Sequence, residues 1–308
     1  MFILKDQVKS FIKYCSCSKK LSPKTIKAYS IDLEQFIVFS NNDFNKDCLS
    51  GYIAFLHQQY KPKTVKRKIA CLKALSNYML YEEIIEESPF AKIKTSFKEP
   101  FILPKTIPLE IVQKILSFAY GQLNSLILTQ HRKEEITRNI AILELLFATG
   151  ARVSEICNLK NSEIDLVNHS VKFYGKGSRE RIIQIENTDV LQSLQTYYHL
   201  FSERIIDRGY FFINRLHNRL SEQSVRFMIK KYAEKIGCSN NVTPHMFRHS
   251  FATLLLEENV DIRYIQKLLG HSTITTTEIY THVSTVKQKE ILATRHPRNR
   301  IIIDMNEG

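Results

Sequence analysis

A histidine and an arginine lie three positions apart in the segment TPHMFRHSFAT, residues 243–253. Thr243 followed by Pro244 is typical of a helix start, so His245 and Arg248 are expected on one face near the N-terminus of a helix. Helix N-termini attract anions, and a histidine and an arginine beside one predict a phosphate site. Two histidines that only cap a buried helix would give the same local pattern.

A zinc site is the alternative at this segment, because His245 and His249 are four residues apart. Arg248 would then lie beside the cation, and no carboxylate lies between the two histidines, so we expect no metal here. The six cysteines are spread along the chain without paired zinc-ligand spacing. They predict free thiols in a reducing compartment.

Two other segments carry basic residues that could contact a phosphate. Arg152 follows a Thr-Gly break and opens a short helix, with Glu155 three residues on to brace its guanidinium. Taken alone, this is an ordinary helix start with an exposed ion pair. Lys176 lies in a Gly-Lys-Gly-Ser turn, where a flexible ammonium could reach a cleft, although most turn lysines are only solvated.

The fourth segment holds a histidine and a tyrosine after a helix end. Gly270 stops the preceding helix and presents His271, and Tyr280 follows nine residues later. A tyrosine hydroxyl can act as a nucleophile if a base removes its proton. A lone tyrosine is nearly always a packing residue, so this segment gains meaning only from the others.

The elements that must position these residues are mainly helices. Apolar residues recur at helical spacing after Ser22-Pro23 and after Pro62, where the opposite face is basic. Further helices are expected over 109–118, 140–148, a short stretch from 152, 189–206, 222–236, 244–257 and 261–270, then on to about 293. Residues 171–174 and 181–185 predict a hairpin. The fold class is therefore mostly α with a small β-sheet.

The chain has 308 residues, which is enough for about two domains. A polar and basic stretch with two prolines suggests a boundary, with a helical domain over 1–95, a linker over 96–104 and a second domain over 105–308. Lys and Arg number 44 and Asp and Glu 31, giving a net charge of +13. This excess is typical of proteins with a polyanionic partner, usually nucleic acid, although a scattered basic surface would give the same total.

Taken together and in order, these segments resemble the tyrosine recombinase family, also called the phage-integrase-type recombinases. The resemblance rests on Arg152, Lys176, His245, Arg248, His271 and Tyr280. It extends over nearly the whole chain, including the N-terminal stretch SPKTIKAYSIDLEQF. The Xer-like branch, with its two-domain layout, is the most similar. The resemblance implies a two-domain DNA clamp, with an N-terminal helical bundle and an α+β catalytic domain.

The resemblance also implies a role for each residue. Arg152 and Arg248 would hold the scissile phosphate, because guanidinium groups match its oxygens and keep their charge. Tyr280 would attack to give a 3′-phosphotyrosine, with His245 as general base. Lys176 would protonate the leaving 5′-oxygen, and His271 would donate a hydrogen bond to the phosphate. Glu155 would act only by bracing its neighbour.

A covalent phosphotyrosine conserves the bond energy, so the resemblance implies neither a metal nor ATP. The sequence agrees, since it has no phosphate-binding loop motif. The expected partner is double-stranded DNA with a specific core site. The chain is expected to form a homotetramer on synapsed DNA and to be a monomer when no DNA is bound. Integration, excision, inversion and resolution all remain open, as does an origin in a mobile genetic element. No signal peptide, membrane span or arm-binding module is expected, which suggests a cytoplasmic, nucleoid-associated protein.

Two rival functions share parts of this pattern. A type IB topoisomerase-like enzyme would use the same phosphotyrosine chemistry without exchanging partners, although the short N-terminal helical domain favours a recombinase. A DNA-binding regulator on the same scaffold would not need the complete set of six residues. Two segments, 119–138 and the tail 294–308, look particular to this chain, and the sequence does not indicate what they do.

Overall fold

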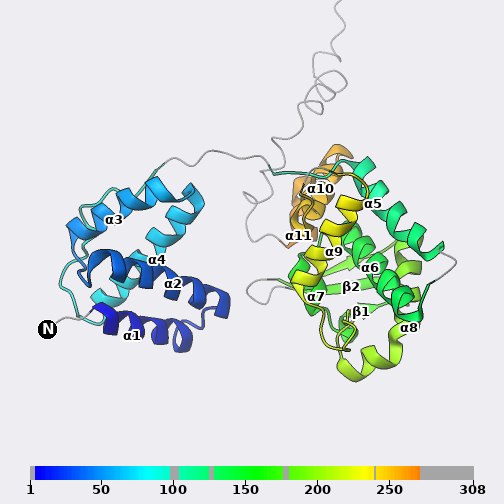
Figure 1. Cartoon of the computed structure of the whole chain (residues 1–308), viewed down its shortest axis with the longest axis horizontal. Coiled ribbons are helices and arrows are strands. Elements are labelled where there is room, and N and C mark those ends of the chain that lie inside the picture. Colours follow the sequence, from blue (N-terminus) through cyan, green and yellow to red (C-terminus); the bar gives the residue numbers. More distant parts are fainter. Residues whose placement is uncertain (1–3, 98–103, 125–127, 176–179, 239–240, 271–308) are drawn as a thin grey trace, which may run out of the picture. The chain divides into compact units, whose positions relative to one another are not determined.

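Figure 1 shows the computed structural model, which describes residues 4–97, 104–124, 128–175, 180–238 and 241–270. The chain divides into two compact units, Met1–Phe101 and Ile102–Gly308. The described part of the first unit is helical, and that of the second combines helices with one small sheet. The expected fold class, mostly α with a small β-sheet, is confirmed.

Four helices make up the described part of the N-terminal unit: α1 (Leu4–Cys17), α2 (Pro23–Ser40), α3 (Lys46–Gln59) and α4 (Pro62–Tyr81). The predicted start of α2 is confirmed, because the Ser22 hydroxyl accepts a hydrogen bond from the backbone N–H of Thr25 at 3.2 Å. The predicted apolar stripe of α4 is also confirmed. Val65, Ile69, Leu72 and Met79 are all buried in the core that the four helices share.

The opposite side of α4 carries exposed basic residues. Lys63, Lys66, Arg67 and Lys73 are all exposed, and they are called here the basic face of α4. Lys68 departs from this pattern, because its side chain is buried and its ammonium lies 2.8 Å from the carboxylate of Asp32. Arg67 on the basic face also binds the carboxylate of Asp32, but its side chain stays 44% exposed, so all four members of the basic face remain accessible to solvent.

The C-terminal unit contains seven α-helices in its described part. They are α5 (Leu109–Gly121), α6 (Gln130–Thr149), α7 (Val153–Asn158), α8 (Thr188–Arg208), α9 (Glu222–Lys235), α10 (Pro244–Glu257) and α11 (Ile262–Leu269). Two short 3-10 turns, Gln122–Asn124 and Asn161–Glu163, follow α5 and α7. Within the described ranges of both units, no helix combines the length and apolarity of a membrane span.

Helix α6 forms the centre of this unit, packed against α5, α8 and α10. Its last ten residues include a nearly continuous run of buried positions, from Ile140 to Leu146. The expected helix over 140–148 was too short, because α6 begins ten residues earlier. Thr129 caps the extension by accepting a hydrogen bond from the backbone N–H of Arg132 at 3.2 Å. The first two turns are mostly polar, so apolar periodicity alone misses them.

The sheet has three antiparallel strands in the order β1 (Ile164–Asp165), β2 (Ser170–Tyr174) and β3 (Glu180–Gln184). The predicted hairpin of β2 and β3 is confirmed, whereas the two-residue β1 was not predicted. Val171 and Phe173 pair with Ile183 and Arg181, which places Arg181 on the face that is otherwise buried and apolar. A charged side chain at this position needs polar partners, and these lie in the candidate active site.

Candidate active site

The end of α6 sets the position of the first predicted site residue, Arg152. Gly150 ends the helix with a left-handed φ of +57°, and the chain then turns into α7 with Arg152 as its N-cap. The carboxylate of Glu155 accepts hydrogen bonds from the backbone N–H of Arg152 at 2.7 Å and from its Nη1 at 2.9 Å. The side chain of Arg152 stays 34% exposed, so an anion can reach its guanidinium.

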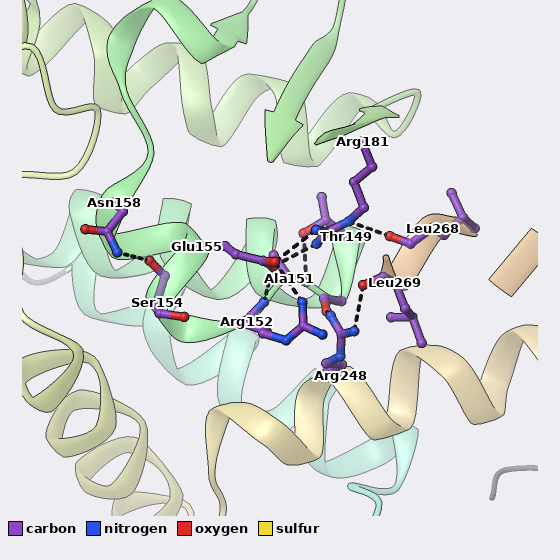
Figure 2. Close-up of polar contacts among 11 residues, drawn as sticks. Thr149, Ala151, Arg152, Ser154, Glu155, Asn158, Arg181, Arg248, Leu268 and Leu269 are labelled. Carbon is purple, nitrogen blue, oxygen red and sulfur yellow. Dashed lines mark hydrogen bonds and ion pairs between the residues drawn. The ribbon is translucent and has the colours of Figure 1, made fainter. Parts of the chain in front are cut away.

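Arg248 reaches the same segment from α10. It is buried, with 4% of its surface exposed, and its Nη1 donates to the carbonyl oxygen of Gly150 at 2.8 Å. Its Nη2 donates to the carbonyl oxygen of Leu269 at 2.7 Å, at the C-terminal end of α11. Figure 2 shows both arginines at the Gly150–Glu155 segment, one from α7 and one from α10. The hydrogen bonds of Arg248 thereby connect α10 to the turn at Gly150, which precedes Arg152, and to the end of α11.

His245 lies one turn before Arg248 on α10, and its imidazole is exposed. Loss of part of its hydration, and then the positive charges of Arg248, Arg226 and Arg152, lower the pKa of His245 below its ordinary value. Glu222 opposes this shift but does not outweigh it. An imidazole with a lowered pKa is neutral at neutral pH and can accept a proton, which is the state that a general base requires.

Glu155 connects this arrangement to the sheet. Its carboxylate lies between Arg152 and Arg181, which binds it with Nη1 at 2.9 Å and Nη2 at 2.8 Å. Burial alone would raise the pKa of Glu155, but the hydrogen bonds and charges of Arg181 and Arg152 lower it below its ordinary value. The carboxylate is therefore charged at neutral pH and can brace both guanidinium groups.

The second histidine of α10, His249, is partly buried one turn after His245. Burial, followed by the charges of His245 and Arg248, lowers the pKa of His249 to about 4. In the described ranges, no group of three His, Cys, Asp or Glu side chains has an arrangement that could hold a metal ion. His249 is therefore a neutral, partly buried imidazole at neutral pH.

Three of the six predicted site residues fall in the described part of the chain, and the structure brings them together. Arg248 is bonded to the turn that precedes Arg152, and the pKa of His245 responds to the charges of both. Lys176, His271 and Tyr280 lie outside the described residues, so their places in the site stay predictions. Two of them adjoin described elements in the chain: Lys176 lies between β2 and β3 in the sequence, and His271 directly follows Gly270 at the end of α11.

Sequence reasoning missed Arg181 among the residues that build this site. The signal was present, because Arg181 is two residues before the apolar Ile183 in a predicted strand, where alternation places both on one face. An arginine on the buried face of a strand requires an acidic or carbonyl partner. The strand was identified, but its inward-facing charge was not used.

Comparisons with known proteins agree with this geometry. The description "Phage integrase family" matches residues 107–287, and "Phage integrase, N-terminal SAM-like domain" matches residues 8–83. A protein of Agathobacter rectalis named tyrosine recombinase is 49% identical over 301 residues, which cover 96% of this chain and 97% of the relative. The tyrosine recombinase XerD of Listeria monocytogenes is 32% identical, covering 96% of this chain and 100% of the relative.

Among solved structures, XerH site-specific recombinase bound to palindromic difH substrate in a post-cleavage complex has the same fold. Its TM-score is 0.74 at 20% identity, over 93% of this chain and 84% of that one. The chain described here belongs to the phage integrase family. Within it, the chain is a tyrosine recombinase of the Xer-like branch, a class of enzyme that carries out site-specific recombination through a tyrosine intermediate.

Proposed function

We propose that this recombinase cuts its DNA site with Tyr280 as the nucleophile, leaving a 3′-phosphotyrosine and a free 5′-hydroxyl. Arg152 and Arg248 bind the scissile phosphate, and His245 accepts the phenolic proton. Lys176 protonates the leaving 5′-oxygen, and His271 donates a hydrogen bond to the phosphate. The 5′-hydroxyl of a partner strand then attacks the phosphotyrosine, which exchanges strands and releases the tyrosine.

The observation that carries this proposal is the pair of anchored arginines beside a histidine with a lowered pKa. Attack on a phosphodiester concentrates negative charge on the non-bridging oxygens, and guanidinium groups held in advance stabilise that charge without reorganising. The backbone carbonyls of Gly150 and Leu269 hold Arg248, and the carboxylate of Glu155 holds Arg152. These anchors support the proposal that two fixed positive groups bind one phosphate, with a neutral base on the same helix as Arg248.

The proposed partner is double-stranded DNA that carries a specific core site. The basic face of α4, Lys63, Lys66, Arg67 and Lys73, supports this partner, because it presents exposed cations on the N-terminal unit. Strand exchange between two sites requires two cuts in each, so we propose four copies of the chain on synapsed DNA and one copy free of DNA. We also propose a cytoplasmic, nucleoid-associated location, where such DNA lies.

We propose further that neither a metal nor a nucleotide takes part. The two arginines supply the charge that a divalent cation supplies in other phosphoryl-transfer sites. The phosphotyrosine keeps the energy of the broken phosphodiester, so resealing requires no ATP. Cleavage should therefore remain at full rate in excess chelator, and a loss that added magnesium restores would contradict this part of the proposal.

Covalent trapping tests the proposal directly. A suicide substrate, nicked near the scissile phosphate, loses the short fragment with the 5′-hydroxyl after cleavage and traps the adduct. The wild-type chain should give a covalent complex on a denaturing gel, with the DNA mapped to Tyr280 by peptide mass spectrometry. Tyr280→Phe should bind the same DNA and form no adduct. An adduct from the Phe variant, or one mapped to another residue, would overturn the assignment.

A further inference from the structure

The side chain of Arg181 on β3 contacts both the start of α7 and the end of α11. Its Nη1 and Nη2 bind the two carboxylate oxygens of Glu155, and its Nε donates to the carbonyl oxygen of Leu268 at 2.7 Å. The side chain is 8% exposed, and its guanidinium carbon lies 5.0 Å from the ring centre of Phe173. Figure 2 shows Arg181 between Glu155 and the end of α11.

The two acceptors of Arg181 belong to different parts of the site. Glu155 is also the brace of Arg152, so the carboxylate transmits the position of one arginine to the other. Leu268 lies in the last turn of α11, two residues before Gly270, where unpaired carbonyls favour a cation. A Cβ at Gly270 would be 3.2 Å from Cδ and Nη1 of Arg181, so the backbone there approaches the side chain closely.

The position of Arg181 in the chain adds a third segment. It is the second residue of β3, five positions after Lys176 in the chain. Its strand partner is Phe173 on β2, so the arginine is fixed on the hairpin by register and by packing. One planar guanidinium thus joins the hairpin, the start of α7 and the end of α11. A lysine ammonium could not bind both oxygens of Glu155 and also reach the carbonyl of Leu268 in this geometry.

We propose that Arg181 is a positioning residue for the cleavage reaction, which sets the start of α7, the β2–β3 hairpin and the end of α11 in register with one another. This inference rests on the proposed function, because Arg152, Lys176 and His271 are the residues that these three segments would present. Within the described residues, Arg181 contacts Glu155, Leu268 and Phe173, so we argue that it acts through the segments that carry them. Its loss should therefore reduce the rate of the chemical step and leave DNA affinity nearly unchanged.

A matched control exists in the same unit. Arg204 on α8 also binds a glutamate through both terminal nitrogens, at 3.1 and 3.3 Å from the oxygens of Glu134. Its guanidinium carbon lies 5.4 Å from the ring centre of Phe201, as Arg181 lies over Phe173. Arg204 is more exposed, and neither its carboxylate nor its ring belongs to the site. Arg204→Lys therefore makes the same chemical change without touching the three segments.

The experiment compares Arg181→Lys with Arg204→Lys in the full-length chain. Single-turnover formation of the covalent adduct is measured on the suicide substrate at saturating protein, and affinity for an uncleaved site is measured separately. Arg181→Lys should slow adduct formation by about 10²-fold, the effect expected of an ångström-scale misplacement, with affinity within about threefold of wild type. Arg204→Lys should match wild type in both. Equal rates for the two variants, with wild type active, would overturn the inference.

A pH profile separates positioning from a general loss of structure. The charged groups that bear on Glu155 are Arg181 on β3 and Arg152 on its own turn. In Arg181→Met, burial of Glu155 is opposed only by Arg152, so its pKa rises and the carboxyl becomes protonated as the pH falls. Adduct formation by this variant should therefore decline on the acid side in addition to the decline that protonation of His245 causes in both proteins. The double variant Glu155→Gln with Arg181→Met has no such group and should show a low rate without this additional decline.

The double variant also distinguishes a positioning role from a folding defect. It removes the charges of both Glu155 and Arg181, so neither is left buried without its partner. It should unfold at a temperature near that of the wild type and still cleave slowly. Recovery of a wild-type cleavage rate in the double variant would mean that Arg181 only neutralises Glu155, and the positioning role would be wrong. If the wild type itself forms no adduct at Tyr280, the proposed function fails instead, whatever the Arg181 variants do.

Discussion

Gly150 offers a sharp test of how the site is supported, because a methyl group at this position would clash with side chains of both α10 and α11. The residue has a φ of +57°, and a Cβ would lie 2.6 Å from Cδ1 of Phe251 and 3.0 Å from Cδ2 of Leu269. Phe251 follows Arg248 by one turn of α10, and Leu269 is the residue whose carbonyl Arg248 binds. Gly150→Ala should therefore push apart the end of α6, α10 and α11.

The loss of unfolding free energy in Gly150→Ala has two parts, backbone strain and displaced packing, and Gly209→Ala serves as the control that separates them. Gly209 ends α8 in the same left-handed conformation, φ +69°, and a methyl group there would meet nothing within 4 Å, so Gly209→Ala introduces only backbone strain. That strain costs about 1–2 kcal/mol. Gly150→Ala adds the displacement of a packed ring, which costs about 1–3 kcal/mol more. We expect the free energy of unfolding to fall by about 2–5 kcal/mol for Gly150→Ala.

Urea unfolding followed by circular dichroism gives these two values, and hydrogen exchange of α6 and α8 assigns each change to its helix. Adduct formation on the suicide substrate should fall for Gly150→Ala and stay at the wild-type rate for Gly209→Ala. If both variants lose the same stability, the ring of Phe251 moves aside at no cost, and the packing part of the reasoning is wrong. If Gly150→Ala is destabilised but cleaves normally, the position of Arg248 does not depend on this turn.

Three further predictions concern charge. His249 has a pKa of about 4 in the folded chain against about 6.5 unfolded, so the unfolded state binds more protons between these values. The free energy of unfolding should fall by at most roughly 3 kcal/mol as the pH drops from about 6.5 to 4. In urea titrations at several pH values, His249→Gln should lack that part of the decrease. The same pH dependence in the variant and the wild type would contradict the prediction. Lys176→Ala should cleave slowly but recover on DNA with a 5′-bridging sulfur, which leaves without a proton, whereas Arg152→Ala should not recover; equal rescue would mean that Lys176 is not the acid. Lys63→Ala should reduce the slope of log affinity against log salt by roughly 1, and an unchanged slope would remove Lys63 from the DNA contact.

Much of the architecture follows from local signals. Ser22, Thr243 with Pro244, Asp261 and Gly270 each end or begin a helix where the sequence predicted it, because capping depends on residues adjacent in the chain. The start of α6 and the strand β1 were missed. The first turns of α6 are polar, and β1 has only two residues, so neither shows an apolar period.

The site was predictable as a set of residue types but not as a network. Arg152, His245 and Arg248 could be chosen from their local patterns and from the family resemblance. Nothing local indicates that Arg248 binds the carbonyl of Gly150, or that Arg181 binds Glu155, because these partners come from different elements. Contacts between a side chain and a distant backbone carbonyl leave no mark on sequence spacing, since every residue offers the same carbonyl whatever its side chain.

The carbonyls that hold the two arginines also set the order in which the site can assemble. Arg248 and Gly150 are 98 residues apart, and Arg181 and Leu268 are 87 residues apart. Such distant pairs close late, because the intervening chain must first be ordered. On a ribosome, Arg152 and Arg181 emerge long before α11 supplies Leu268 and Leu269. A growing or prematurely ended chain thus carries Arg181 without its acceptor on α11, and Arg181 and Arg248 reach their described positions only when synthesis has passed α11.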